Sequence, residues 1–342
     1  MVDCDVHAVV DGIEPLEPYL DAHWREVIAT SQFSGPTDRA HPPNLATSRR
    51  ADLEPTAGTT VESLRAGVLD GPGADWAIVT CDYGVESIRN PDAAAAIAAA
   101  VNDWLVAEWL EREPRLRAGL VVPAGHVDPA VREVHRVGGH PGFVAVHLPV
   151  RAAMPYGNRA WWPLWRAIAA HDLVGALHFG GSPGLPPTAS GWPTSWLEEY
   201  VDMASAFQSQ LTSVVAEGTF DEMPELRIAL LESGFAWLPA FLWRFDKGWR
   251  GLRREVPWTR RAPSAYVRDH VRIGLQPVDG PLDGARLAAL VDQLGSEDML
   301  MFSTDYPHAH TDEGLAALPS GLPGALREKI LSSNAREHFR LP

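Results

Sequence analysis

The chain contains 342 residues, of which 46% are hydrophobic and 21% are charged, and this balance excludes a largely disordered protein. Its formal net charge of -15 opposes a general attraction to nucleic acid phosphates or anionic lipid, so we expect neither partner. The start shows no basic and apolar signal-peptide pattern, and no uninterrupted apolar run reaches the roughly 20 residues that a membrane span requires. These features predict a globular cytoplasmic protein.

Short apolar runs rich in β-branched residues alternate along the chain with longer segments of helical character, as in repeated βα units with a parallel sheet. In chain order, we predict eight strands at 2–6, 76–80, 116–122, 143–147, 173–178, 226–231, 271–275 and 299–303. We predict helices at 91–113, 159–171, 195–218, 237–252, 283–294 and 324–339. This order favours an α/β fold of the (β/α)₈ TIM-barrel type, with a single domain over residues 1–342.

Two segments interrupt the alternation of strands and helices. Residues 31–60 are rich in proline, serine and polar groups, and residues 180–194 read GGSPGLPPTASGWPT. Both compositions are typical of loops. The second segment follows the fifth predicted strand, which places it on the catalytic face of a barrel. We expect these two inserted loops to determine the substrate, because barrel enzymes diverge mainly through such loops.

Candidate metal ligands stand at the carboxyl ends of the predicted strands, where barrel enzymes carry their reactive groups. Asp5 and His7 end the first strand, His178 ends the fifth, and Asp305 follows the eighth. Residues two apart on a strand share a face, so Asp5 and His7 both face the barrel mouth. Imidazole and carboxylate ligands suit a divalent metal, for which zinc is our first expectation and manganese or iron the alternatives.

Other polar residues at strand ends have both a functional and a structural interpretation. Glu232 ends the sixth strand, where it completes the metal shell, acts as an acid or base, or pairs with a cation such as Arg244. His308 either orients a metal ligand, donates a proton to substrate, or has a structural role. His147 ends the fourth strand, but the nearby Pro149 indicates that the chain is turning away.

Cys81 and Asp82 follow the second predicted strand, where their side chains are candidates to line the pocket. No base is assigned that would make the thiol a nucleophile. The sequence also shows no nucleophile elbow, P-loop or dinucleotide fingerprint. A covalent or nucleotide-dependent mechanism is therefore not favoured, and we expect no organic cofactor.

Four short segments, DCDVH, HFGG, FSTDYPH and SNAREHF, follow one another from near the start of the chain to near its end. Together they resemble the amidohydrolase-related family that includes aminocarboxymuconate-semialdehyde decarboxylase and the resorcylate decarboxylases. The resemblance implies that Asp5 and His7 form the first-strand metal motif and that His178 is the fifth-strand ligand. It also implies that Asp305 binds metal or transfers a proton, and that the protein is a homodimer.

The sixth strand departs from the pattern of the decarboxylases that the chain resembles. Some members end this strand in a histidine that assists catalysis, whereas this chain reads LLESG with Glu232. The difference leaves three functions open. The first is non-oxidative decarboxylation of an aromatic or unsaturated acid, with Asp305 as the proton donor. The second is metal-dependent hydrolysis of an amide, ester, lactone or carbon–carbon bond, and the third is a catalytically inactive barrel that serves as a binding protein.

Overall fold

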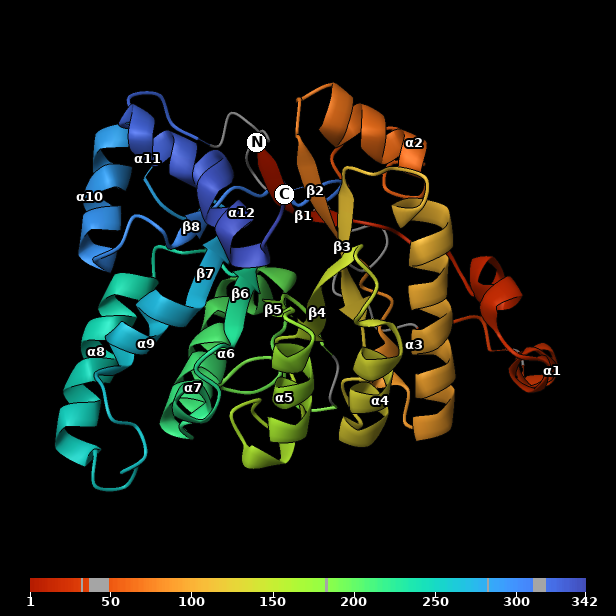
Figure 1. Ribbon diagram of the computed structural model, residues 1–342, viewed down its shortest axis with the longest axis horizontal. Coiled ribbons are helices and arrows are strands. Elements are labelled where there is room, and N and C mark those ends of the chain that lie inside the picture. The colour runs from red at the N-terminus through yellow and green to blue at the C-terminus, as the bar shows by residue number, and fades with distance from the viewer. Residues whose placement is uncertain (32, 37–48, 182–183, 282, 310–317) are drawn as a thin grey trace.

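The computed structural model describes residues 1–31, 33–36, 49–181, 184–281, 283–309 and 318–342. Eight parallel strands form one sheet in the order β1 to β8 (Figure 1). Their bounds are β1 Val2–His7, β2 Trp76–Thr80, β3 Leu116–Val121, β4 Phe143–Pro149, β5 Val174–His178, β6 Arg227–Leu231, β7 Val271–Gly274 and β8 Leu300–Met301. The predicted barrel is confirmed, and each predicted strand overlaps an observed one.

Backbone contacts bring the end of the sheet back to its beginning. The amide of Cys4 donates to the carbonyl of Phe302 at 3.0 Å, and the amide of His7 donates to the carbonyl of Tyr306 at 2.7 Å. Val6 and Tyr306 also form an isolated parallel bridge. The segment after β8 therefore lies against β1, which brings Asp305 beside Asp5 although 300 positions separate them in the sequence.

Helices surround the strands in Figure 1, and the two chain ends lie close together at one end of the barrel. The helices are α1 Ala22–Ser31, α2 Val61–Leu64, α3 Pro91–Leu105, α4 Val127–Val137, α5 Trp162–Ala170, α6 Trp196–Ala216, α7 Thr219–Glu222, α8 Leu238–Leu252, α9 Pro263–His270, α10 Gly284–Leu294, α11 Gly324–Glu328 and α12 Asn334–Phe339. Short 3₁₀ and π-helical turns extend several of them.

All six predicted helices overlap observed ones, but the sequence pattern missed others, α4 and α9 among them. Pro129 stands inside the first turns of α4, and α9 begins at Pro263. A proline inside an apparent helix reads as a breaker, yet its fixed φ is compatible with the first turn. Residues 32 and 37–48 of the predicted 31–60 loop, together with residues 182–183 of the 180–194 loop, lie outside the described residues. The described part of 180–194 contains no helix, as expected.

Among the described residues, one helical stretch, Pro91–Leu110, is long and apolar enough to cross a membrane by length and composition alone. Asn90 caps its N-terminus, since the Asn90 side chain accepts hydrogen bonds from the amides of Asp92 and Ala93. Half of its apolar window is buried, and Ile97 belongs to the hydrophobic core. This burial indicates that the stretch packs against the barrel as a core helix.

Small and branched side chains fill the inside of the barrel. A separate buried cluster includes Ala145 on β4 and Ala176 on β5. His147 and His178 stand two residues further along the same strands, so they share the inward face of these alanines. The apolar layer therefore supports a polar layer at the carboxyl ends of the strands.

Candidate metal centre

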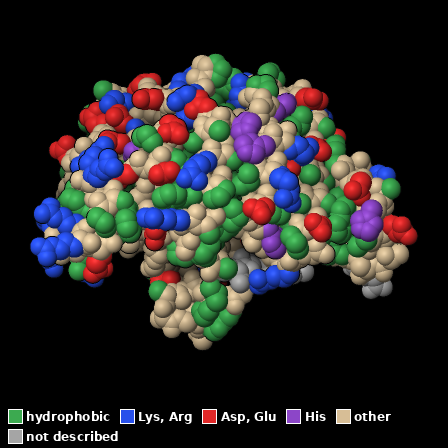
Figure 2. Space-filling view, turned by 60° about the horizontal axis from the view of Figure 1, so that its bottom comes forward, with side chains coloured by type: hydrophobic (Ala, Val, Ile, Leu, Met, Phe, Trp, Pro, Cys, Tyr) green, Lys and Arg blue, Asp and Glu red, His purple; other side chains and the backbone are tan. Residues whose placement is uncertain are grey.

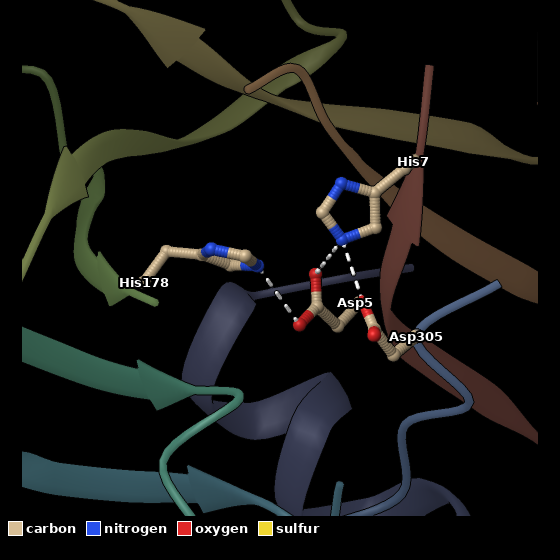
Figure 3. A group of neighbouring side chains, drawn as sticks. All are labelled: Asp5, His7, His178 and Asp305. Atoms are coloured by element: carbon tan, nitrogen blue, oxygen red, sulfur yellow. Dashed lines mark ion pairs between the residues drawn. The ribbon is translucent and has the colours of Figure 1, made fainter. Parts of the chain in front are cut away.

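The centre of the site is formed where β1 meets the segment after β8. His7 Nε2 lies 2.7 Å from Asp305 Oδ1 and 3.7 Å from Asp5 Oδ1 (Figure 3). The amide of Asp305 donates to the carbonyl of Asp5 at 3.0 Å, and Asp305 has a φ of 57°. This left-handed backbone is uncommon for a residue with a Cβ, and strain of this kind is concentrated at functional sites.

The backbone that carries Asp305 is held by a second pair of residues. Asp3 is fully buried on β1, and its carboxylate accepts hydrogen bonds from the hydroxyl of Thr304 at 2.6 Å and from its amide at 3.0 Å. Burial raises the pKa of Asp3 to about 7, although these hydrogen bonds act in the opposite direction. The contact fixes the turn immediately before Asp305.

His178 approaches the same carboxylates from the opposite side of the barrel mouth. Its Nε2 lies 3.3 Å from Asp5 Oδ2, and its Nδ1 lies 2.9 Å from the carbonyl oxygen of Phe179. A carbonyl oxygen only accepts hydrogen bonds, so this contact places a proton on Nδ1. The lone pair on Nε2 is then available to a metal ion.

The four residues offer ligand atoms that lie within 4.8 Å of one another, and all four side chains are buried. Asp5 Oδ2 and His178 Nε2 make no hydrogen bond within the described part of the chain, despite full burial. Such atoms are costly to bury unless a ligand satisfies them. Two carboxylates and two imidazoles match the ligand preference of a divalent transition metal, so the cluster indicates a divalent metal site.

The protonation states of the two histidines agree with this interpretation. Burial lowers the pKa of His7, but the carboxylate of Asp305 raises it to well above 6.5. Burial likewise lowers the pKa of His178, whereas Asp82 and Asp5 raise it to about 10. The carboxylates thus attract positive charge into this space, and a divalent cation that binds there displaces protons from the imidazoles.

Asp82, which follows β2, lines the pocket as the sequence indicated, but its contacts with three histidines were not predicted. Its carboxylate lies 3.3 Å from His7 Nδ1, 2.9 Å from His147 Nε2 and 3.7 Å from His178 Nδ1. Burial raises its pKa, but His178 and His147 hold the pKa well below 3.8. In the sequence, Asp82 is marked as a site residue only by its position beside Cys81, just after a barrel strand.

The inference that the chain turns away at Pro149 was wrong. β4 continues to Pro149 and pairs with His178 of β5 at that residue. His147 is therefore only 7% exposed and faces Asp82 instead of solvent. It lies at the edge of the site, while the four ligand atoms of the main cluster come from other residues.

Glu232 and His308 both lie beside the main cluster. Glu232 is buried, has a φ of 55°, and places Oε2 3.9 Å from His178 Nε2. His308 Nδ1 lies 3.1 Å from Asp305 Oδ1, and its ring centroid is 4.2 Å from that of His7. The structure thus brings together the six residues predicted as metal ligands or catalytic groups, Asp5, His7, His178, Glu232, Asp305 and His308. Arg244, the sequence candidate for pairing with Glu232, lines an outer groove with residues of α6 instead.

A cavity of about 230 Å³ opens onto this cluster. Its walls include His7, Asp82 and His308, together with Arg49 and Tyr83. Arg49 Nε is buried and makes no hydrogen bond within the described residues. A guanidinium in a pocket beside a cation site is suited to an anionic ligand, because it offers several donors to a carboxylate.

The model of the amidohydrolase family matches residues 2–341 of this chain. The chain belongs to the amidohydrolase family. A search of curated proteins gave no significant match. The family membership agrees with a barrel whose strand ends carry imidazoles and carboxylates.

Three solved structures illustrate the similarity in fold. The 2,6-dihydroxybenzoate decarboxylase from Rhizobium is 22% identical, with a TM-score of 0.70 over 99% of this chain and 98% of that one. An amidohydrolase from Mycobacterium avium subsp. paratuberculosis K-10 is 20% identical, with a TM-score of 0.75 and coverage of 99% and 98%. The 5-carboxyvanillate decarboxylase from Novosphingobium aromaticivorans DSM 12444, complexed with manganese and 4-hydroxy-3-methoxy-5-nitrobenzoic acid, is 19% identical, with a TM-score of 0.72 and coverage of 99% and 96%. These similarities show a shared fold.

Proposed function

We propose that this member of the amidohydrolase family is a metal-dependent enzyme that decarboxylates an aromatic or unsaturated carboxylic acid without oxidation. The observation that carries the proposal is the buried cluster of Asp5, His7, His178 and Asp305 at the mouth of the barrel. Arg49 in the adjoining cavity supports an anionic substrate. Two of the similar structures described above are aromatic acid decarboxylases, one with manganese and a nitrobenzoic acid bound.

Asp5, His7, His178 and Asp305 would hold the metal. A bound divalent ion supplies a Lewis acid that orients the substrate and stabilises negative charge on its oxygens. We assign zinc as the metal of first choice, since two imidazoles and two carboxylates suit it, with manganese and iron as alternatives. Metal analysis of protein purified without added zinc, followed by reconstitution with each ion, tests this choice.

The side chains around the metal site account for the remaining steps. Arg49 binds the anionic substrate in the cavity. Asp305, protonated when it is not bound to the metal, gives its proton to the carbon that bears the carboxylate. The electrons of the breaking carbon–carbon bond return to the π system of the substrate, and carbon dioxide leaves. His308, 3.1 Å from Asp305, orients the carboxyl group and returns a proton to it.

A hydrolytic function is the second candidate, and Glu232 favours it. This carboxylate replaces a histidine of some decarboxylases and lies 3.9 Å from His178 Nε2. A base in this position suits the removal of a proton from water as it attacks a carbonyl. Substrate screening tests the choice. Release of carbon dioxide from hydroxylated benzoates supports the first proposal, whereas turnover of esters, lactones or amides alone supports the second.

The third candidate, an inactive barrel that binds a ligand, is tested by metal content. Absence of any transition metal in the purified protein, with failure to bind one on addition, would reject both enzyme proposals. Asp5 Oδ2 and His178 Nε2 are buried and make no hydrogen bond to any described residue, which argues for metal binding.

We also propose that the chain forms one domain and assembles as a homodimer through α8. Trp243 and Leu252 on α8 are each 59% exposed, and a groove of about 720 Å³ lies between α8 and α6. Figure 2 shows one face of the molecule, on which exposed hydrophobic side chains lie among charged ones. Light scattering tests the assembly, and Trp243→Glu is expected to give monomers.

We propose a cytoplasmic location and small-molecule substrates, in keeping with the acidic composition.

A further inference from the structure

One carboxylate lies among three histidines at the barrel mouth. Asp82 Oδ2 faces His7 Nδ1 at 3.3 Å, while Asp82 Oδ1 faces His147 Nε2 at 2.9 Å. The ring of His178 is also close, with Nδ1 3.7 Å from Asp82 Oδ2. The histidines come from β1, β4 and β5, and Asp82 follows β2, so four strand ends converge on one acidic group.

The two nitrogens of His7 face different carboxylates. Nε2 lies 2.7 Å from Asp305, on the metal side, and Nδ1 lies 3.3 Å from Asp82, on the other side. A neutral imidazole carries its proton on one nitrogen and a lone pair on the other. A carboxylate at Nδ1 stabilises the proton there, and the lone pair then points from Nε2 towards the metal side.

The same residues admit a second interpretation, in which Asp82, His147 and His178 bind a metal of their own. That cluster requires the lone pair of His178 Nδ1, the nitrogen that faces Asp82. However, Nδ1 lies 2.9 Å from the carbonyl oxygen of Phe179 and therefore carries the proton of that hydrogen bond. Without His178, only two ligands remain, which argues against a separate metal site.

We infer that Asp82 is a positioning residue of the metal centre, which holds the proton of His7 on Nδ1 and presents Nε2 to the metal. His147 on β4 lies 2.9 Å from the second oxygen of this carboxylate, and the contact restricts rotation of the Asp82 side chain. Carboxylates that hold metal-bound histidines in this way raise metal affinity by about 10- to 100-fold. The inference rests on the proposed metal-dependent function.

The test is to measure the affinity of the Asp82→Asn variant and of the parent protein for Zn²⁺. Competition with a chelator gives the dissociation constant of each. The amide is the same size as the carboxylate, but it lacks the negative charge that faces His7 Nδ1 and His147 Nε2. We expect the dissociation constant for Zn²⁺ to rise about 10- to 100-fold. Asp82→Ala, which removes both acceptors, is expected to weaken binding at least as much. Asp103→Asn is the matched control, because Asp103 pairs with Arg136 on the outer helices.

Two further measurements separate positioning from folding. The thermal midpoint of the zinc-free Asp82→Asn protein shows whether the fold persists, and nitrogen-15 NMR of labelled histidines in the zinc-loaded protein reports the proton position on His7. We expect a folded variant in which the Nδ1-protonated form of His7 is depleted. If the variant does not fold, the same NMR measurement on the zinc-loaded parent decides: an Nδ1 proton on His7 supports the inference, and an Nε2 proton overturns it.

The outcomes also distinguish this inference from the proposed function. A parent protein that binds no divalent metal contradicts the metal-dependent function itself. A parent that binds Zn²⁺ with a folded Asp82→Asn variant of equal affinity overturns only the role of Asp82. Two zinc ions per chain in the parent, falling to one in Asp82→Asn, would also overturn it, because Asp82 would then be a ligand.

Discussion

His7 Nε2 lies 2.7 Å from Asp305 Oδ1, although the two residues stand near opposite ends of the sequence. Closure of the barrel creates this contact, since the segment after β8 pairs with the end of β1. The metal centre is therefore formed only when the first and last strands meet. Metal binding therefore requires that the whole barrel be folded.

Replacement of His178 by alanine is expected to abolish metal binding and activity while the barrel stays folded. His178 supplies the imidazole that faces Asp5 from the far side of the site, so its removal leaves three ligands. The measurements are metal content per chain and the far-ultraviolet circular dichroism spectrum. His135→Ala is the control, because that histidine lies on α4 and pairs with His171. Full metal content in His178→Ala would reject the assigned ligand set.

Asp305→Asn is expected to lower kcat by about 10²- to 10⁴-fold, the usual range for loss of a general acid or base. His308→Gln should have a smaller effect, about 10- to 100-fold, because His308 acts by holding Asp305. Both variants are assayed with saturating metal. A larger loss in His308→Gln than in Asp305→Asn would mean that the histidine transfers the proton to substrate.

Arg49→Met is expected to raise KM by about 10- to 100-fold, since a hydrogen bond to a charged group contributes about 1.5–3 kcal/mol. Methionine retains an unbranched side chain like the aliphatic part of arginine, but it lacks the guanidinium donors. Arg50→Met serves as the control, because the neighbouring guanidinium pairs with Asp52. Steady-state kinetics with the identified substrate provide the measurement. An unchanged KM would show that the substrate carboxylate binds elsewhere.

Glu113→Gln is expected to lower the free energy of unfolding by about 1 kcal/mol at neutral pH. Hydrogen bonds from Arg115 and Arg65 lower the pKa of Glu113 from 4.5 to about 2. A lowered pKa stabilises the fold above about pH 4.5, and this contribution disappears as the pH falls towards 2. Urea unfolding of both proteins across this range should therefore show a shrinking difference, with Glu111→Gln unaffected. A constant difference would contradict the assignment.

The strand ends were predictable because their chemistry is local in sequence. Asp5 and His7 lie at the end of the buried strand β1, and His178 ends β5, so position alone placed them at the barrel mouth. The role of Asp82 was not predictable in this way. It depends on how β1, β2, β4 and β5 are arranged around the barrel, and a single sequence does not show which imidazoles face one carboxylate.

Glu232 illustrates a second limit of sequence reasoning. Its position after β6 was clear, but its direction depends on a φ of 55°, which turns the side chain towards His178. Left-handed backbone at a residue with a Cβ is not indicated by residue type. The helix α4 was missed because Pro129 was not recognised as part of a first helical turn.

The central claim, metal-dependent decarboxylation, is tested most directly by product analysis in ¹⁸O-labelled water. The metal-loaded protein is incubated with a panel of hydroxylated benzoates and, separately, with aromatic esters, amides and lactones, and both carbon dioxide and the organic product are measured. We predict carbon dioxide release that a chelator stops and that added divalent metal restores, with no ¹⁸O in the organic product. An organic acid that contains ¹⁸O, formed without carbon dioxide, would contradict the account and establish hydrolysis.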